Sequence, residues 1–142
     1  MTRSPFAAPL FAALACLSLM ACQDEAAAGA DPLAVLGTGV EWRVTEIDGQ
    51  PVPEGVTVTI TQPEPGLLAG TSGCNRYSGR ISAEGSALKI GALAGTRMMC
   101  PDPQMQAEQA FHSNISRIDG AQITGGLLEL TREGAVMIRA TK

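Results

Sequence analysis

The residues of this chain whose types could do chemistry gather in one stretch, residues 70–100. Cys74 lies near its start and Cys100 at its end, and no other cysteine occurs beyond residue 22. In an oxidising compartment such a pair forms a disulfide, which for a loop of this length stabilises the fold by roughly 3.5 kcal/mol. In a reducing compartment the two residues would instead pack as small buried hydrophobes. The compartment therefore decides between a covalent staple and two free thiols.

Two methionines, Met98 and Met99, directly precede Cys100. Thioether and thiolate sulfurs are soft ligands that suit copper, so this group could form a copper site. Sulfur type alone supports that hypothesis, because the sequence gives no geometry. Methionines more commonly fill gaps in a hydrophobic core, and we expect that role here.

Glu108 and His112 are four positions apart in a segment with helical periodicity. Their spacing could pair them or hold a metal, but zinc takes three or four ligands and the chain has a single histidine. We expect a solvated pair on the flank of the helix. A nucleophilic site would have to combine His112 with Asp119 or Cys100, and nothing in the sequence brings these together. The sequence therefore predicts no catalytic residue, no metal and no cofactor.

The segment Gly73–Gly79 is dense in residues that favour turns, and it predicts a sharp turn or bulge in a sheet. Arg76 and Tyr77 within it, and Arg97 close to Cys100, are the candidate binding residues, expected to be exposed beside that turn. Structural hydrogen bonding and packing is the alternative role for all three.

Short strands must position these residues. Alternation of apolar and polar side chains predicts half-buried strands at Trp42–Ile47 and Val56–Thr61, with Trp42 as a core anchor. Gly91–Gly95 is expected to be a glycine-rich connection. Further strands are expected at Leu67–Thr71, Tyr77–Ala83, Leu88–Ile90, Ala121–Thr124, Leu127–Arg132 and Ala135–Ala140. Thr96–Met99 is expected to be a strand or an extended segment.

One main helix is predicted at about residues 103–117, with Asp102 as its N-cap and Pro103 at its first position. Its apolar stripe must pack on the sheet. The fold class is therefore α+β and mainly antiparallel, a curled or barrel-like sheet of about seven or eight short strands with one packed helix. The stripe consists of Ala107, Phe111, Ile115 and Ile118.

The first 22 residues have the pattern of an export signal. A basic start precedes the apolar run Phe6–Ala21, which is too short for a comfortable membrane span. The run ends in Leu19–Cys22, a sequence typical of a bacterial lipobox, where a peptidase cuts before Cys22 and the new N-terminus is acylated. Several acyl chains anchor a protein stably where one chain does not. An ordinary cleaved signal with an incidental cysteine is the alternative.

The chain after Cys22 is rich in alanine, glycine and small polar residues. We expect a signal peptide at residues 1–21, a lipidated flexible tether at 22–39 and one folded domain at 40–142. Within the tether, Pro32–Leu36 could pack onto the domain or form a short helical turn. Gln23 after the lipidated cysteine favours sorting to the outer membrane, facing the periplasm.

The charge of the chain excludes one class of partner. Fourteen acidic side chains stand against ten basic ones, for a formal net charge of −4 over 142 residues. Basic residues form no block, so we expect no nucleic-acid binding.

An ordered set of motifs also carries a family resemblance. The set comprises Trp42, Asp48–Val52, Gly73–Gly79, Leu93, Thr96–Cys100, Glu108 and Leu127–Leu130. In this order the motifs resemble the META domain of HslJ-like bacterial proteins, over about residues 40–141. The resemblance implies a similar fold, a secreted or envelope-anchored location and a link to stress response and motility. It implies no agreed catalytic activity, so it identifies no active-site residues.

These observations together predict a non-catalytic envelope lipoprotein. Its partners would be membrane lipid, through acylated Cys22, and an envelope protein that it binds or protects under stress. The alternative is a periplasmic protein that binds a small ligand or a metal through the region of Cys74 and Cys100.

Overall fold

The computed structural model describes residues 30–142, so the expected signal peptide (1–21), Cys22 and residues 23–29 of the expected tether lie outside the described residues. The described part forms a nine-stranded sheet and two helices. The helices are α1 (Pro32–Leu36) and α2 (Asp102–Ile115), and the strands are β1 (Glu41–Ile47), β2 (Gln50–Pro51), β3 (Thr57–Thr61), β4 (Leu67–Gly73), β5 (Arg76–Glu84), β6 (Ala87–Gly95), β7 (Gly120–Thr124), β8 (Leu127–Arg132) and β9 (Ala135–Thr141).

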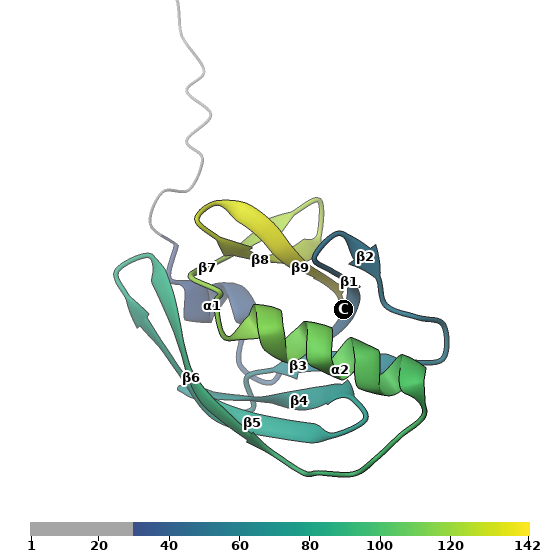
Figure 1. The fold of residues 1–142 in the computed structure, drawn as a ribbon. Helices are drawn as coiled ribbons and strands as arrows, with labels where there is room; N and C mark the ends of the chain where they lie inside the picture. The colour runs from purple at the N-terminus through teal and green to yellow at the C-terminus, as the bar shows by residue number, and fades with distance from the viewer. Residues whose placement is uncertain (1–29) are drawn as a thin grey trace, which may run out of the picture.

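The strands pair antiparallel in the order β6-β5-β4-β3-β1-β9-β8-β7, and β2 pairs with β1 off this path. The sheet curls, and α2 lies across its open side (Figure 1). The sheet is not closed by a ladder between β6 and β7; instead the Leu88 amide of β6 donates to the Asp119 carbonyl, just before β7, at 2.8 Å. The predicted α+β fold with a curled antiparallel sheet and one main helix is therefore confirmed, with nine strands instead of seven or eight.

The core lies between the sheet and the predicted apolar stripe of α2. Phe111 and Ile115 are fully buried and Ala107 is nearly so. Ile118, the last residue of that stripe, is also buried but lies beyond the end of α2. The sheet contributes mainly aliphatic side chains, as the low aromatic content requires: Val44, Ile47, Val58, Ile60, Leu68, Leu88, Leu128, Leu130 and Ile138.

The folded part begins earlier than residue 40. Asp31 caps α1 by accepting from the Leu33 amide at 3.0 Å, and Leu36 is buried in the core. Trp42, the predicted core anchor, is buried and its Nε1 donates to the Leu36 carbonyl at 2.8 Å. Pro32–Leu36 therefore both forms a short helix and packs onto the domain. Leu36 is buried in the core, and the Leu36 carbonyl accepts the hydrogen bond of the Trp42 indole.

α2 differs from the predicted helix at both ends. It starts at Asp102 with Pro101 as its N-cap, and no side chain caps it, so the predicted capping role of Asp102 is wrong. Asp102 lies in the first turn, where a negative charge favours the positive end of the helix dipole. The helix ends at Ile115, before residue 117. Within residues 30–142 neither helix has the length and apolarity needed to cross a membrane.

β6 is longer than predicted, because it runs through the segment expected to be a glycine-rich connection. Its last residues pair with β5, Leu93 opposite Gly79 and Gly95 opposite Tyr77. A Cβ on Gly79 would lie 2.6 Å from a Leu93 methyl, so the absence of that Cβ lets Leu93 pack across the pair. Thr96–Met99 is not a strand; it is an exposed loop leading to α2.

Candidate functional site

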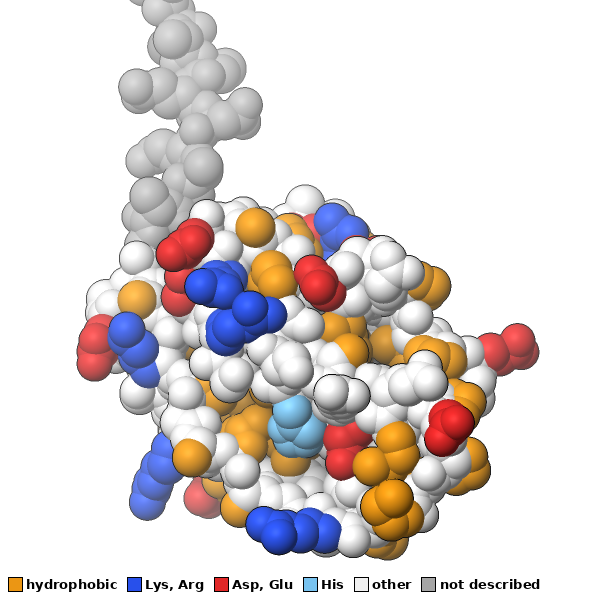
Figure 2. Space-filling view, in the orientation of Figure 1, with side chains coloured by type: hydrophobic (Ala, Val, Ile, Leu, Met, Phe, Trp, Pro, Cys, Tyr) orange, Lys and Arg blue, Asp and Glu red, His pale blue; other side chains and the backbone are white. Residues whose placement is uncertain are grey.

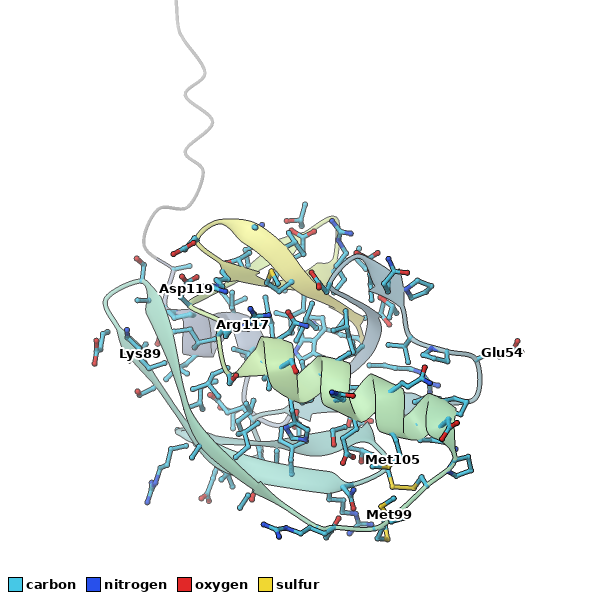
Figure 3. The ribbon with its side chains drawn as sticks, in the orientation of Figure 1. Glu54, Lys89, Met99, Met105, Arg117 and Asp119 are labelled. Carbon is cyan, nitrogen blue, oxygen red and sulfur yellow. A yellow bond between two sulfur atoms is a disulfide. The ribbon has the colours of Figure 1, made fainter. Side chains whose placement is uncertain are left out.

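Cys74 and Cys100 form a disulfide, with their Cα atoms 5.8 Å apart. It fastens the turn after β4 to the end of the loop that precedes α2. The yellow bond lies beside the start of α2, between the labels of Met105 and Met99 (Figure 3). The predicted disulfide is confirmed. Neither sulfur is available as a thiolate nucleophile or as a thiolate ligand for a metal.

Asn75, in the turn between β4 and β5, makes every hydrogen bond that its side-chain amide can make. Its Oδ1 accepts from Thr96 Oγ1 at 2.8 Å and from the Met98 amide at 2.6 Å. Its Nδ2 donates to the Met98 carbonyl at 3.1 Å and to Glu108 Oε1 at 2.9 Å. Two donors and two acceptor lone pairs are thereby all used. This one buried side chain joins the turn, the loop before α2 and α2 itself.

Glu108 reaches from α2 back to the same turn. Its Oε2 accepts from the Asn75 amide at 2.7 Å and lies 3.0 Å from Ser72 Oγ. The expectation of a solvated Glu108–His112 pair is therefore wrong for Glu108, because the turn supplies hydrogen-bond donors that helix periodicity cannot reveal. We call the connected residues Ser72, Asn75, Thr96, Met98 and Glu108 the turn network.

The backbone at Gly73 explains how α2 comes so close to the turn. Gly73 has φ of +120°, and a Cβ there would lie 2.7 Å from the Gln104 carbonyl of α2. Only glycine tolerates both the positive φ and the close approach. The glycine thus lets α2 pack against β4 and brings Glu108 to Asn75.

The turn network changes the acidity of Glu108. Partial burial of this carboxyl raises its pKa, but hydrogen bonds from Asn75, Ser72 and the Cys74 backbone outweigh burial. The pKa of Glu108 therefore lies below its ordinary value of 4.5 in the folded protein. The folded state therefore favours the ionised form of Glu108, and no cationic side chain of residues 30–142 forms a salt bridge with it.

This lowered pKa predicts a loss of stability in acid. Below pH 4.5 the unfolded state takes up a proton at Glu108 before the folded state does, so the free energy of unfolding falls as the pH drops further. Glu108→Gln should flatten this pH dependence, measured by urea denaturation between pH 7 and pH 3. The control is Glu54→Gln, since Glu54 is exposed and points away from the domain (Figure 3). An unchanged slope in Glu108→Gln would contradict the assignment.

His112 packs beside aromatic rings. Its ring centroid lies 6.0 Å from that of Tyr77 and 5.6 Å from that of Phe111, both at edge-on angles. Residues 30–142 contain no group of three or more His, Cys, Asp or Glu side chains placed to hold a metal ion.

Tyr77 is not exposed beside the turn, so its choice as a surface binding residue is wrong. It is buried, its ring lies 5.0 Å from that of Phe111, and its hydroxyl donates to the Thr59 carbonyl at 2.8 Å. Burial raises the pKa of the Tyr77 hydroxyl far above its usual range. The side chain points inward because position 77 of β5 faces the core, as the buried Ile81 four residues on also does.

Replacing Tyr77 by Phe is expected to lower the free energy of unfolding by about 1–2 kcal/mol, since the Thr59 carbonyl loses its buried donor. Thermal or urea denaturation measures this loss. The matched control is Phe111→Tyr, which adds a hydroxyl to a fully buried ring and should cost more. A Tyr77→Phe variant as stable as the parent would show that the hydrogen bond contributes nothing.

The remaining candidates, Arg76 and Arg97, are exposed. The Arg76 backbone is tied to the adjacent loop, its amide to Thr96 Oγ1 at 3.2 Å and its carbonyl to the Thr96 amide at 3.1 Å. Beside them lies a shallow depression of about 330 Å³, lined by Arg76, Tyr77, Ser78, Ala94, Gly95 and Thr96.

Met98 and Met99 are exposed, 56% and 87% respectively, so the expectation that they fill gaps in the core is wrong. Their loop must run along the surface, because its backbone is held at Met98 by Asn75 and its end at Cys100 by the disulfide. The two side chains are left pointing outward with no core position to occupy.

A second polar cluster crosses the other half of the sheet, and sequence reasoning missed it. Glu129 of β8 accepts from Gln122 of β7 at 2.8 Å and from Arg139 of β9 at 3.1 Å, and Arg139 also pairs with Glu46 of β1 at 2.7 Å. Hydrogen bonding from Gln122, then from Arg139, lowers the pKa of Glu129. The sequence did carry a signal for this cluster, because Glu129 stands within the otherwise apolar run Leu127–Leu130. The cluster is a row of cross-strand pairs that stabilises the sheet.

The comparisons with known proteins agree on the fold. The family model of the META domain matches residues 31–142. An NMR structure of a protein from Burkholderia xenovorans aligns with a TM-score of 0.62 at 23% identity and covers 99% of this chain and 97% of that chain. A second NMR structure aligns with a TM-score of 0.54 at 24% identity, over 70% of this chain and 86% of that chain. No curated protein matches. Because the family model spans most of the sequence and all but the first of the described residues, the chain belongs to the META domain family.

Proposed function

We propose that this META-domain chain is an exported, lipid-anchored protein of the bacterial envelope that acts by binding other envelope components and not by catalysis. The disulfide Cys74–Cys100 is the observation that carries the proposal. Stable disulfides belong to oxidising compartments, which agrees with the export signal and lipobox pattern of residues 1–22.

The proposal of binding without catalysis rests on what the reactive groups do. Cys74 and Cys100 bond to each other, and the Glu108 carboxylate is occupied by donors from Asn75 and Ser72. A general base needs a free lone pair directed at a substrate, whereas Glu108 directs its oxygens into the domain.

The surface beside the turn network supports binding. The loop from Thr96 to Cys100 is fixed at Asn75 and at the disulfide, and it presents Arg97, Met98 and Met99 to the outside. A fixed loop loses little conformational entropy when a partner docks. Exposed methionine and arginine side chains are enriched where proteins meet.

The anchor is tested by the intact mass of the detergent-extracted protein, measured with and without reduction and alkylation. The expected species starts at Cys22, carries three acyl chains and takes up alkylating reagent only after reduction. A chain with an unmodified N-terminus and reactive thiols at Cys74 and Cys100 would overturn the anchor, the location and the oxidising compartment together.

The binding role is tested separately, by crosslinking in intact cells followed by recovery of the protein. A defined envelope partner should be recovered with the parent protein and lost with an unfolded variant of the chain. Recovery of the same set of proteins with both forms would contradict the role.

A further inference from the structure

The outer edge of β6 is open over its last residues. β6 is the terminal strand of the sheet, and its first half is covered where Leu88 donates to the Asp119 carbonyl. The labels of Lys89 and Asp119 lie toward that covered end (Figure 3). A register shift opposite Gly79–Ile81 separates this half from the regular pairing that resumes at Leu93. We call Leu93–Gly95 the open edge.

The backbone of the open edge has free hydrogen-bonding groups. The Thr96 amide donates to the Arg76 carbonyl of β5, so the alternation of a strand turns the Gly95 and Leu93 amides to the opposite, outer side. Within residues 30–142 no hydrogen bond reaches that side of Leu93–Gly95. Sheet edges are usually protected by proline, charge or a covering element, and Leu93, Ala94 and Gly95 provide neither proline nor charge.

Positive charge and a shallow depression lie at the end of the open edge. Arg76 and Arg97 flank it, both exposed, and neither forms a salt bridge within the described residues. The depression of about 330 Å³ is lined in part by Ala94, which has only a methyl group, and by Gly95, which has no side chain. Two separate blue side chains lie at the lower margin of the molecule, with a red one between them (Figure 2).

We propose that the open edge binds an extended, acidic polypeptide segment of another envelope protein, which adds to β6 as a further strand. Backbone hydrogen bonds to Leu93 and Gly95 would supply the pairing, and a carboxylate on the segment would lie at Arg76 and Arg97. The partner's location rests on the proposed function, but the surface itself does not.

The charges of the hairpin argue against a second copy of this chain as the occupant. Arg76, Arg80 and Lys89 are exposed on β5 and β6, and Glu84 is the only acidic side chain of the two strands. Two such edges paired with each other would bring like charges together. An acidic segment meets the same surface with opposite charge.

Peptides with blocked ends test the proposal on the full chain in detergent. The probe is a fluorescent Thr-Val-Asp-Val-Thr peptide, whose single charge is the Asp carboxylate. We expect binding by fluorescence anisotropy, weakened about tenfold when Asn replaces Asp. N-methylation of alternate amides, which removes the donors of one peptide edge, should abolish binding. Equal binding of the N-methylated peptide would overturn strand addition.

Protein variants and hydrogen exchange locate the site. Arg97→Gln should weaken binding about tenfold, whereas Arg80→Gln, which removes the same charge from β5, should leave it within twofold. On addition of the peptide, exchange of the Leu93 and Gly95 amides should slow. Slowed exchange at other residues instead, or equal effects of the two arginine variants, would overturn the proposal.

Two other segments could occupy the open edge, and hydrogen exchange distinguishes them. Finding either one there would overturn the proposal. If a second copy covers the edge, the Gly95 amide becomes protected as protein concentration rises without peptide. If the acidic residues 23–29 of the same chain cover it, the amide is protected at every concentration, and Asp24→Asn with Glu25→Gln removes the protection. Failure of the peptide test leaves the lipid anchor untouched, because the intact mass measures that separately.

Discussion

Replacing Asn75 by Asp is expected to lower the free energy of unfolding by about 3–5 kcal/mol. Asp keeps the size of the side chain but loses both donors, so the Met98 carbonyl and Glu108 Oε1 each lose a partner. It also sets a second carboxylate against Glu108, whose Oε1 lies 2.9 Å from Asn75 Nδ2. Urea denaturation at pH 7 measures the loss.

The control for this exchange is Gln109→Glu, which also turns an amide into an acid but does so at an exposed position of α2. It should change stability by less than about 0.5 kcal/mol. The Asn75→Asp variant should also recover part of its stability near pH 4, where the new carboxyl and Glu108 can share a proton. A loss equal to that of Gln109→Glu would show that the turn network contributes little.

Removing the disulfide is expected to cost about 3.5 kcal/mol, because Cys74 and Cys100 close a loop with a sequence separation of 26. The double variant Cys74→Ala with Cys100→Ala tests this by urea denaturation. Its loss should match that of the parent protein under reducing conditions, and added reductant should not destabilise the double variant further. Unchanged stability in both would mean that the turn network holds the loop by itself.

The two effects should not add. Asn75 and the disulfide both hold the loop before α2 against the turn after β4. Once either constraint has been removed and the loop is free, the remaining constraint stabilises the folded state less. The double-mutant cycle should therefore give a combined loss smaller than the sum of the two.

Side-chain alternation was sufficient to predict much of the sheet. In strands with one apolar face, such as β1 and β3, apolar and polar side chains alternate every two residues, and this alternation is visible in the sequence. The hairpin of β8 and β9 also follows from its Glu133–Gly134 turn, where both residues have positive φ. The end of β6 could not be predicted this way, because glycine and alanine carry no period and only pairing with β5 makes them a strand.

The candidate site was predicted less well, because it is assembled across the fold. The Cys74–Cys100 disulfide followed from counting the cysteines of a chain that was expected to be exported. Tyr77 is buried and the neighbouring Arg76 is exposed, because their side chains lie on opposite faces of β5. The contact between Asn75 and Glu108 joins a turn to a helix 33 positions later in the sequence, and no local pattern encodes it.

The place of β1 between β3 and β9 determines when this chain can finish folding. The Thr45 hydroxyl of β1 donates to the Arg139 carbonyl of β9, a residue 94 positions later. Contacts this distant in sequence form slowly, since a long loop must close first. During synthesis from the N-terminus, β1 therefore has one unpaired edge until residues 135–141 are added. During that interval the unpaired edge of β1 is exposed to aggregation, and pairing with β9 removes that risk.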